Sequence, residues 1–272
     1  MDRFNVGIRT GYGWNMSEEA EIKITGIRRD DLADPEIMDL IYRSRQTYYW
    51  TDDWSPEMYL ALARAGFIST SLEMGGPSDL FLLLPEIQAA YALLDWENLH
   101  ASRSMKRWMR SEEFSQHGFQ LEVGVDALEI ARKIDAAHSD NWLQGRYLNL
   151  LTELEQGSWD DFELMPVALL TAGGRLVAGE LGYRTGSIYT SLTGFFDRKD
   201  RQFNHAGKLQ LHLLADYLQT RGFAFWNLGH PHMPYKTELG AKITPRAEFL
   251  ERWQEVVVGD VRGLGENGRR PS

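Results

Sequence analysis

Four basic side chains recur at helical spacing near the middle of the chain. They are Arg103, Lys106, Arg107 and Arg110. At about 100° per residue, these offsets put all four on one face of a helix, within about 100° of arc. Lys and Arg gathered on one face bind a phosphate backbone by displacing its counterions. The spacing therefore predicts a nucleic-acid contact; the alternative is a solvated face paired with Glu112 or Glu113.

Two imidazoles also lie close together, because His230 and His232 flank Pro231. On an extended segment both face one way and, with Glu238, offer three ligands for a metal ion. A turn with two exposed imidazoles fits the same residues, and we favour it. The sequence therefore predicts no metal site.

The composition limits what the whole chain can do. Its 272 residues, 43% hydrophobic and 25% charged, are typical of a globular protein with one large domain or two modest ones. The net charge of −10 argues against nucleic-acid binding through the overall field, which leaves a local basic patch. There is no cysteine, which excludes disulfides, thiolate nucleophiles and Cys-ligated zinc.

The sequence predicts neither export nor a membrane span. Its start, MDRFNVGIRTGYGW, lacks the apolar run of a signal peptide, and no apolar run approaches about 20 residues. Since cysteine is also absent, we expect a cytoplasmic protein.

Helix signals occur at several places. Asp34 and Pro35 predict a helix start that runs to Arg45, and Ser55 with Pro56 predicts a second helix that Gly66 ends. A basic helix is expected after residues 98–102, and further helices at residues 127–137, 143–155 and 206–220.

Strand signals surround these helices. Short apolar runs predict strands at residues 22–27, 81–85, 90–96 and 223–228, and residues 167–196 read as three antiparallel strands with turns at Gly173-Gly174 and Thr185-Gly186. A strand meander followed by a helix and another strand is the order of the N-acetyltransferase (GNAT-type) fold. We therefore predict an α+β, GNAT-type mixed sheet at residues 98–258, behind a smaller α+β domain at residues 1–97, with a disordered tail at residues 259–272.

An acyl-CoA-dependent GNAT enzyme holds pyrophosphate on a glycine-rich loop. Here only Arg201 and Ala206 fit that loop, and Asn204 replaces its first glycine, which hinders close approach of the backbone to phosphate. A Walker loop, a G-x-S-x-G elbow and an H-E-x-x-H helix are absent from the sequence.

Three separated segments resemble one known family. SPEMYLALARAGFI at residues 55–68 is similar to SPERLLAAYRRGIF, and NLHASRSMKR at residues 98–107 to DLHISRSLRK. The block of residues 204–253, NHAGKLQLHLLADYLQTRGFAFWNLG followed by HPHMPYKTELGAKITPRAEFLERW, is similar to DNASKVALVHLVERLRARGFELIDCQ and PHLASLGAREIPRAEFL. These are patterns of the leucyl/phenylalanyl-tRNA-protein transferases.

The resemblance implies a reaction and its substrates. This family moves Leu, Phe or Met from tRNA to the N-terminal amine of a polypeptide, with a GNAT-type domain and without a metal or organic cofactor. The implied partners are an aminoacyl-tRNA and a polypeptide or small amine acceptor. The segment with Arg103, Lys106, Arg107 and Arg110 matches a candidate tRNA contact of the family.

The residues that match the family's reactive positions are changed. A family Asp and Gln, two residues apart, fall on Asn227 and Gly229, and a neutral amide does not act as a base. A family Glu falls on Leu192, and a family Trp falls near Thr70. These changes indicate altered chemistry.

Other matched positions are kept or gained. Trp142 matches a Trp expected near the aminoacyl-adenosine. Lys208 matches a family Lys at the start of the long helix after the meander, where a helix N-terminus attracts anions, so it is a candidate contact for the terminal adenosine phosphate. Glu180 replaces a frequent Gly on a strand expected to pair with that of Leu192, so its carboxylate is a candidate for the same cleft. Glu180 as an exposed polar residue, Lys208 as a surface lysine and Asn227 as a buried structural amide are the alternatives.

The hypothesis is a divergent aminoacyl-tRNA-dependent transferase with Asn227 and Glu180 nearest the reacting ester. Trp142, Lys208, Leu192 and Thr70 are the other predicted substrate contacts. A catalytically silent relative that binds tRNA or a peptide, and an acyl-CoA-dependent N-acyltransferase, are the competing hypotheses.

Overall fold

The computed structural model describes residues 5–8, 22–74, 80–138 and 141–257. The chain forms two compact units, one of Met1–Ala89 with His138–Gln156 and one of Ala90–Ala137 with Gly157–Ser272. Residues 90–94, which lie before the predicted boundary at residue 97, form a strand of the second unit's sheet. The predicted tail at residues 259–272 lies outside the described residues.

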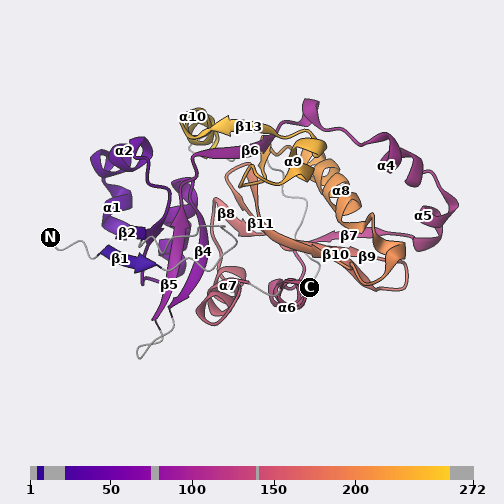
Figure 1. Ribbon diagram of the computed structural model, residues 1–272, viewed down its shortest axis with the longest axis horizontal. Helices are drawn as coiled ribbons and strands as arrows, with labels where there is room; N and C mark the ends of the chain where they lie inside the picture. The colour runs from indigo at the N-terminus through magenta and orange to yellow at the C-terminus, as the bar shows by residue number, and fades with distance from the viewer. Residues whose placement is uncertain (1–4, 9–21, 75–79, 139–140, 258–272) are drawn as a thin grey trace. The chain divides into compact units, whose positions relative to one another are not determined.

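The first unit is α+β (Figure 1). In its described part, strands β1, β2 and β3 form one sheet in that order, and β4 pairs with β5 in a hairpin. The elements are β1 (Asn5–Ile8), β2 (Ile22–Gly26), α1 (Arg29–Ala33), α2 (Pro35–Arg43), β3 (Tyr49–Trp50), α3 (Pro56–Arg64), β4 (Ile68–Met74), β5 (Leu80–Glu86) and α7 (Arg146–Gln156).

Both predicted helix starts in this unit are confirmed. The side chain of Asp34 accepts hydrogen bonds from the backbone N–H groups of Glu36 and Ile37, so it caps α2. Ser55 caps α3 in the same way through the N–H of Met58. These bonds satisfy N–H groups that lack partners within the helix.

The second unit is built on a mixed sheet. Its strands follow the order β13-β6-β12-β11-β10-β9-β7, and β8 also pairs with β10. The elements are β6 (Ala90–Leu94), η1 (Trp96–Asn98), α4 (Arg103–Trp108), α5 (Glu112–His117), β7 (Gln120–Val123), α6 (Ala127–Ala137), β8 (Phe162–Leu164), β9 (Val167–Leu170), β10 (Leu176–Thr185), β11 (Ile188–Phe196), η2 (Arg201–Phe203), α8 (Ala206–Thr220), β12 (Phe225–Asn227), α9 (Pro234–Leu239), β13 (Lys242–Pro245) and α10 (Arg246–Val257).

The predicted meander, helix and closing strand are confirmed. Strands β9, β10 and β11 are antiparallel neighbours, α8 follows, and β12 returns parallel to β11. The second turn closes one residue later than predicted, since Thr185 pairs with Ile188 across Gly186 and Ser187. Gly186 has φ of +57°, a conformation that glycine adopts without a Cβ penalty. The unit is α+β with the strand order expected of a GNAT-type fold.

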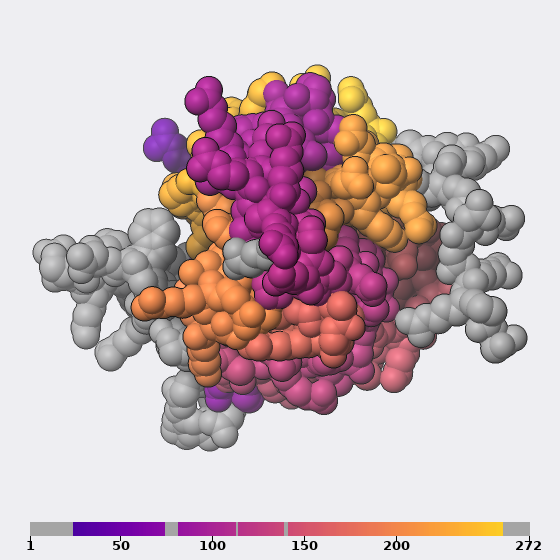
Figure 2. Space-filling model, turned by 90° about the vertical axis from the view of Figure 1, so that its right-hand side faces the viewer, coloured from indigo at the N-terminus to yellow at the C-terminus, as the bar shows by residue number. Residues whose placement is uncertain are grey.

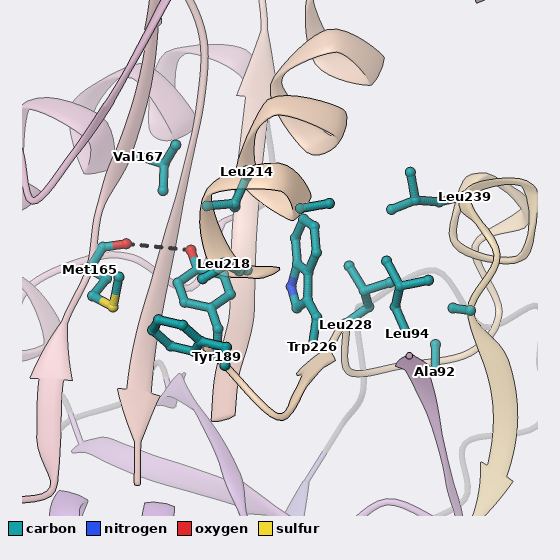
Figure 3. Packing of buried hydrophobic residues seen from close by; sticks show 13 residues of the cluster. Ala92, Leu94, Met165, Val167, Tyr189, Leu214, Leu218, Trp226, Leu228 and Leu239 are labelled. Atoms are coloured by element: carbon teal, nitrogen blue, oxygen red, sulfur yellow. Dashed lines mark hydrogen bonds between the residues drawn. The ribbon is translucent and has the colours of Figure 1, made fainter. Parts of the chain in front are cut away.

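Helices cover both faces of this sheet. Helix α8 contacts β10, β11 and β12, whereas α6 contacts β10 and β11, and Figure 1 shows the two helices on opposite sides of these strands. Under α8, the rings of Tyr189 and Trp226 pack with Leu214 and Leu218 in a buried hydrophobic cluster (Figure 3). The cluster fixes the two parallel strands and α8 relative to one another.

None of the helices in the described ranges is both long and apolar enough to cross a membrane.

Candidate functional site

A buried carboxylate lies in the middle of strand β10. Glu180 is 5% exposed, and three side chains donate hydrogen bonds to it. The hydroxyls of Tyr189 and Ser191 donate to Oε1 at 3.0 and 2.9 Å, and the amide of Gln210 donates to Oε2 at 3.0 Å. The donors come from β11 and α8, so the carboxylate ties the sheet to the helix above it.

Two glycines make room for this arrangement. A Cβ on Gly182 would lie 2.2 Å from the Tyr189 hydroxyl, so only glycine lets that ring cross β10 to reach Glu180. Gly194 pairs directly with Glu180, and a Cβ there would lie 2.9 Å from the Cβ of Glu180. A side chain at position 182 would therefore displace the Tyr189 hydroxyl, and one at position 194 would press on the Cβ of Glu180.

Burial and the groups around Glu180 have opposite effects on the pKa of its carboxyl. Burial raises the pKa of its carboxyl, while the bonds from Gln210, Ser191 and Tyr189 and the charge of Lys236 lower it. Lys236 is itself buried, and its ammonium donates to the backbone carbonyls of Leu228 and His230. Burial lowers the pKa of Lys236 to about 8, with the charge of Glu180 acting against that shift.

Strand β11 changes its pairing next to this carboxylate. Gly182 pairs with Ser191 and Leu181 with Thr193, so Leu192 is the extra residue of a β-bulge. A bulge bends the strand and redirects its side chains. Leu192 is half-buried, one residue from the Ser191 that bonds Glu180. The predicted site residues Glu180 and Leu192 thus lie on paired strands, Leu192 at the bulge and Glu180 two residues before Gly182.

The two parallel strands part at the same place. β12 pairs with β11 only at Ile188, Tyr189 and Thr190, and within the described chain no other strand pairs with that edge of β11. Ser191 is the first residue beyond the paired stretch, and it is half-buried whereas the three residues before it are buried. Its hydroxyl also accepts a hydrogen bond from the indole Nε1 of Trp226 at 2.8 Å.

Asn227 lies on the opposite face of the sheet from Glu180. Side chains alternate along a strand, and Trp226 is on the Glu180 face. Asn227 is 1% exposed; its Oδ1 accepts the N–H of Gly229 at 2.9 Å, and its Nδ2 lies 3.5 Å from the hydroxyl of Thr190. The two predicted catalytic side chains, Asn227 and Glu180, are therefore not brought together.

Lys208 lies in the first turn of α8 and lines a small pocket. Its ammonium forms a 2.9 Å ion pair with Glu238, and both side chains are largely exposed. The pocket, of about 30 Å³, is also lined by His100, Ser102, Met105, Leu211, His212, Tyr235 and Leu239. Burial lowers the pKa of His212, and the charges of His100, Lys208 and Lys106 lower it further. Two predicted cations, Lys106 and Lys208, thus act on one imidazole.

The four predicted basic side chains are all exposed, but they do not share one helix. Helix α4 ends at Trp108, and Arg110 lies in the following turn, before Ser111 caps α5. The expectation of one continuous helical face over all four was wrong. Trp108, at the end of α4, is buried. Figure 2 shows the face with this segment in magenta at the surface.

No ion pair holds these cations among the side chains that the structure describes. The four are Arg103, Lys106, Arg107 and Arg110. Glu112, one of the two proposed partners, instead accepts a hydrogen bond from Gln116; the side chain of the other, Glu113, is outside the described set. The exposed charges are available to a polyanion.

Two further predicted residues, Thr70 and Trp142, belong to the first unit. The Trp142 ring lies 4.6 Å from that of Tyr147, and its carbonyl accepts a hydrogen bond from Ser71. Thr70 precedes Ser71 on β4, so strand alternation points its side chain to the other face, where it lies 3.4 Å from the carbonyl of Leu84. Thr70 is thus next in sequence to the Ser71 that bonds the Trp142 carbonyl. Its own side chain, however, points to the opposite face of β4 from Ser71.

The two histidine rings lie close together and are tilted by 44° to one another. The rings of His230 and His232 are 4.4 Å apart, and Glu238 is paired with Lys208. Across the residues with described positions, no three His, Cys, Asp or Glu side chains are placed to hold a metal ion. Burial, followed by His232 and Lys236, lowers the pKa of His230.

Sequence reasoning missed the partners of Glu180. Ser191, Gln210, Trp226 and Lys236 were not predicted as site residues. The period-2 pattern of β11 places Tyr189 and Ser191 on one face, which was a usable signal. The choice of Glu180 as their neighbour depends on the register at the bulge, which no residue pattern indicates.

The chain is similar in sequence to a known protein family. The family model described as "Leucyl/phenylalanyl-tRNA protein transferase" matches residues 93–254. A leucyl/phenylalanyl-tRNA–protein transferase from Maridesulfovibrio salexigens is 25% identical over 205 residues, which are 75% of this chain and 78% of that protein.

Solved structures resemble the chain more distantly. The C-terminal domain of a putative lysylphosphatidylglycerol synthetase from Agrobacterium fabrum has a TM-score of 0.43 and 13% identity, over 78% of this chain and 72% of that one. The L-PGS structure from Bacillus licheniformis has a TM-score of 0.39 and 11% identity, over 78% and 71%.

Proposed function

Because the chain belongs to the leucyl/phenylalanyl-tRNA–protein transferase family, we propose that it moves an amino acid from an aminoacyl-tRNA to an amine acceptor, with formation of a peptide bond. The observation that carries the proposal is the extent of the family match, residues 93–254, which includes the mixed sheet from β7 to β13 and helix α8. The donated residue is Leu-like or Phe-like, and the acceptor is a polypeptide or a small amine. Charged tRNA as the donor implies a cytoplasmic protein.

The reaction makes few demands on the protein. It needs an amine held close to the ester carbonyl, a path for the amine proton, and donors for the developing oxyanion. Glu180 is the carboxylate proposed to receive the proton, and the parting of β11 and β12 beside Leu192 is the proposed position of the ester. The position of the bulge supports this choice, because it lies just after Thr190, the last residue of β11 that pairs with β12.

Donor binding is proposed for the cations around α4 and α8. Arg103, Lys106, Arg107 and Arg110 present exposed charge without an ion-pair partner in the described chain, and Lys208 lines the pocket that also holds His212. We assign the first four to the tRNA backbone and Lys208 to a phosphate near its 3′ end.

Trp142 and Thr70 are the proposed contacts to the aminoacyl end of the tRNA. Trp142 is half-buried and packs on Tyr147, which leaves part of the indole for an aminoacyl-adenosine. Thr70 is proposed as a second contact. Trp142 is the better supported of the two, because it matches a family Trp.

For Asn227 we propose a positioning role. Its amide accepts the N–H of Gly229, which has φ of +70°, so it holds the turn after β12 in shape. A neutral amide does not accept the amine proton. Asn227 therefore shapes the end of β12 next to the opening.

Two observations favour a catalytically silent relative as the second candidate. Asn227 is buried with its amide engaged, and both oxygens of Glu180 already accept hydrogen bonds. A silent relative binds tRNA or a peptide N-terminus without transfer. Acyl-CoA-dependent N-acylation stays an alternative, supported only by Arg201 and Ala206.

Incubation of the protein with radiolabelled Leu-tRNA or Phe-tRNA and a peptide with a basic N-terminus tests the proposal. Label in the peptide is the expected result. A tRNA mobility shift at low salt without label in the peptide would favour the silent relative. Neither shift nor transfer, together with thermal stabilisation by acetyl-CoA, would favour the acyl-CoA alternative.

A further inference from the structure

We propose that Ser191 is the catalytic residue that carries the amine proton to Glu180 at the parting of β11 and β12. The inference rests on the proposed aminoacyl transfer and deepens it, because it assigns the proton path. Four observations on this chain's own residues lead to it.

The hydroxyl hydrogen of Ser191 has one available direction. Trp226 Nε1 only donates, so the Ser191 oxygen must accept that 2.8 Å bond with a lone pair. The Ser191 hydrogen then points to Glu180 Oε1, 2.9 Å away, because the carboxylate only accepts. The two hydrogen bonds, from Trp226 to Ser191 and from Ser191 to Glu180, therefore run in one direction, as a proton relay to Glu180 requires.

One lone pair of Ser191 remains for a substrate. A hydroxyl oxygen accepts two hydrogen bonds, and Trp226 uses one. Ser191 is half-buried and follows the last residue of β11 that pairs with β12. An amine N–H that enters where the strands part can therefore donate to Ser191.

Among the described residues, no other hydrogen-bond partner of Glu180 gives a substrate access to it. Tyr189 and Gln210, which donate the other two hydrogen bonds to Glu180, are 0% and 3% exposed, and Glu180 itself is 5% exposed. Ser191 is the partly exposed member of the set. A proton from an incoming amine thus reaches the carboxylate through Ser191.

The carboxylate is suited to hold that proton briefly. Burial raises the pKa of Glu180 above that of an ordinary carboxyl, whereas its three donors and the charge of Lys236 favour the ionised form. A base whose pKa lies closer to neutral pH both accepts and returns a proton more readily.

The step balances in atoms and charge. The free amine nitrogen bonds to the ester carbonyl carbon; its proton passes to the Ser191 oxygen while the Ser191 proton passes to Glu180. The bond from the carbonyl carbon to the ribose oxygen then breaks, and the leaving oxygen takes a proton from Ser191 as Glu180 returns its own. The products are an amide and a free ribose hydroxyl, and both side chains are regenerated.

Single-turnover transfer from Leu-tRNA to the peptide, with Ser191→Ala, Ser191→Thr and Glu180→Gln, tests the relay. Loss of general base catalysis lowers the rate about 100-fold or more in Ser191→Ala and in Glu180→Gln. The double variant is no slower than either single variant, because both act in one path. Ser191→Thr keeps a hydroxyl and recovers most of the rate.

A matched control lies two residues along the same strand. Thr193 is half-buried like Ser191 but lies on β11 beyond the bulge, opposite Leu181. Thr193→Val removes a hydroxyl without a change of volume, and transfer stays at the wild-type rate.

The pH profile separates a proton path from a structural role. The wild-type rate falls on the acid side as Glu180 takes up a proton. Gln210→Met removes a donor that lowers the pKa of Glu180, so it moves this acid limb to higher pH. Glu180→Gln lacks the limb, and all variants keep wild-type tRNA binding in filter assays.

Transfer by Ser191→Ala at the wild-type rate would overturn the relay and leave the proposed function standing. So would a loss in Ser191→Ala that Ser191→Thr does not recover, or an acid limb unmoved by Gln210→Met. A wild-type protein that gives no transfer from any aminoacyl-tRNA would overturn the proposed function, and the relay with it.

Discussion

Glu180 is the residue whose burial is hardest to compensate. An ionised carboxylate taken out of water costs several kcal/mol unless hydrogen bonds and opposite charge replace the lost hydration. Here Tyr189, Ser191 and Gln210 each donate to it, and the Lys236 ammonium acts on it. Each partner is therefore expected to matter more than a surface hydrogen bond, because removal of one leaves a buried polar group poorly satisfied.

Gly182→Ala tests the packing that lets Tyr189 reach Glu180. The new Cβ would lie 2.2 Å from the Tyr189 hydroxyl and 2.8 Å from the carbonyl of Thr190, so the ring or the strand must shift. Over-packing of this kind lowers the free energy of unfolding by about 1 to 3 kcal/mol. Urea unfolding of the two proteins measures it.

Gly173→Ala is the control for that substitution. Its new Cβ would have only the Thr171 hydroxyl, 3.8 Å away, within 4 Å, so unfolding should match that of the wild type. Equal stability of Gly182→Ala and the wild type would contradict the described position of the Tyr189 ring.

Lys236 should make the free energy of unfolding depend on pH in the alkaline range. Its folded pKa of about 8 is depressed from the ordinary 10.5, so between these values the unfolded chain binds a proton that the folded chain has released. Stability contributed through Lys236 therefore rises with pH across this window. The gain amounts to about 3 kcal/mol, at 1.36 kcal/mol per pKa unit.

Lys236→Met lacks this titration. The free energy of unfolding of the wild type, minus that of Lys236→Met, should increase from pH 8 to pH 10.5 in urea titrations. Parallel pH curves for the two proteins would show that the Lys236 ammonium is not buried as described. Glu180→Gln, which removes the opposing charge, should widen the window by lowering the pKa of Lys236 further.

At this scale, sequence alone identified Glu180 and Leu192 as neighbours on paired strands, and the structure supports that proximity. It did not identify Ser191, because the match to the family points to Leu192, one residue along. Which of the two faces Glu180 depends on the bulge, and a shift of one residue turns a strand's side chains to the other face. Asn227 was placed beside Glu180 for the same reason, without knowledge of the face it occupies.

Among the elements, the short basic segment of α4 has the clearest functional consequence. Ser102 caps its start and Ser111 caps α5 immediately after it, so the two helices are separate and the chain turns between them. The turn leaves Arg110 exposed outside α4. Three of the four cations therefore lie on α4 and the fourth, Arg110, on the turn after it.

Removal of the α4 cations should weaken tRNA binding in a salt-dependent way. In a variant with Arg103, Lys106 and Arg107 changed to Ala, each lost phosphate contact lowers the slope of log affinity against log salt by about one. Filter binding of tRNA between low and moderate salt measures the slope.

Arg132→Ala with Lys133→Ala on α6 is the control, since both of these cations are exposed on another helix. Unchanged affinity is expected for this control. If the α6 variant loses as much tRNA affinity as the α4 variant, the affinity depends on the net charge of the protein and not on the cations of α4.

Elements with strong local signals were predictable and the others were not. The capped helices α2 and α3 and the long α8 follow from Asp34, Ser55 and the 3.6-residue period. Strand β7 (Gln120–Val123) and helix α9 (Pro234–Leu239) were missed because four to six residues carry too little periodicity. Helix α7 begins at Arg146, three residues later than its apolar pattern suggested.

The whole molecule has the scaffold of its family, and the substitutions at Leu192, Asn227 and Gly229 are the basis for the proposal of a changed reactive strand. The chain belongs to the leucyl/phenylalanyl-tRNA–protein transferase family over residues 93–254, and the order of β9, β10, β11, α8 and β12 was predictable because each element has its own signal. Its division into units was less predictable, since residues 138–156 return to the first unit through packing that the sequence does not encode locally.

The central claim is that this scaffold still forms a peptide bond from an aminoacyl-tRNA. Mass spectrometry of a peptide with a basic N-terminus, after incubation with the protein and either Leu-tRNA or Phe-tRNA, tests it most directly. We expect a product heavier by one donated residue, with the amide at the peptide's N-terminus, and less of it with Ser191→Ala. An unmodified peptide under conditions in which the protein binds the charged tRNA would show that the protein does not carry out this transfer.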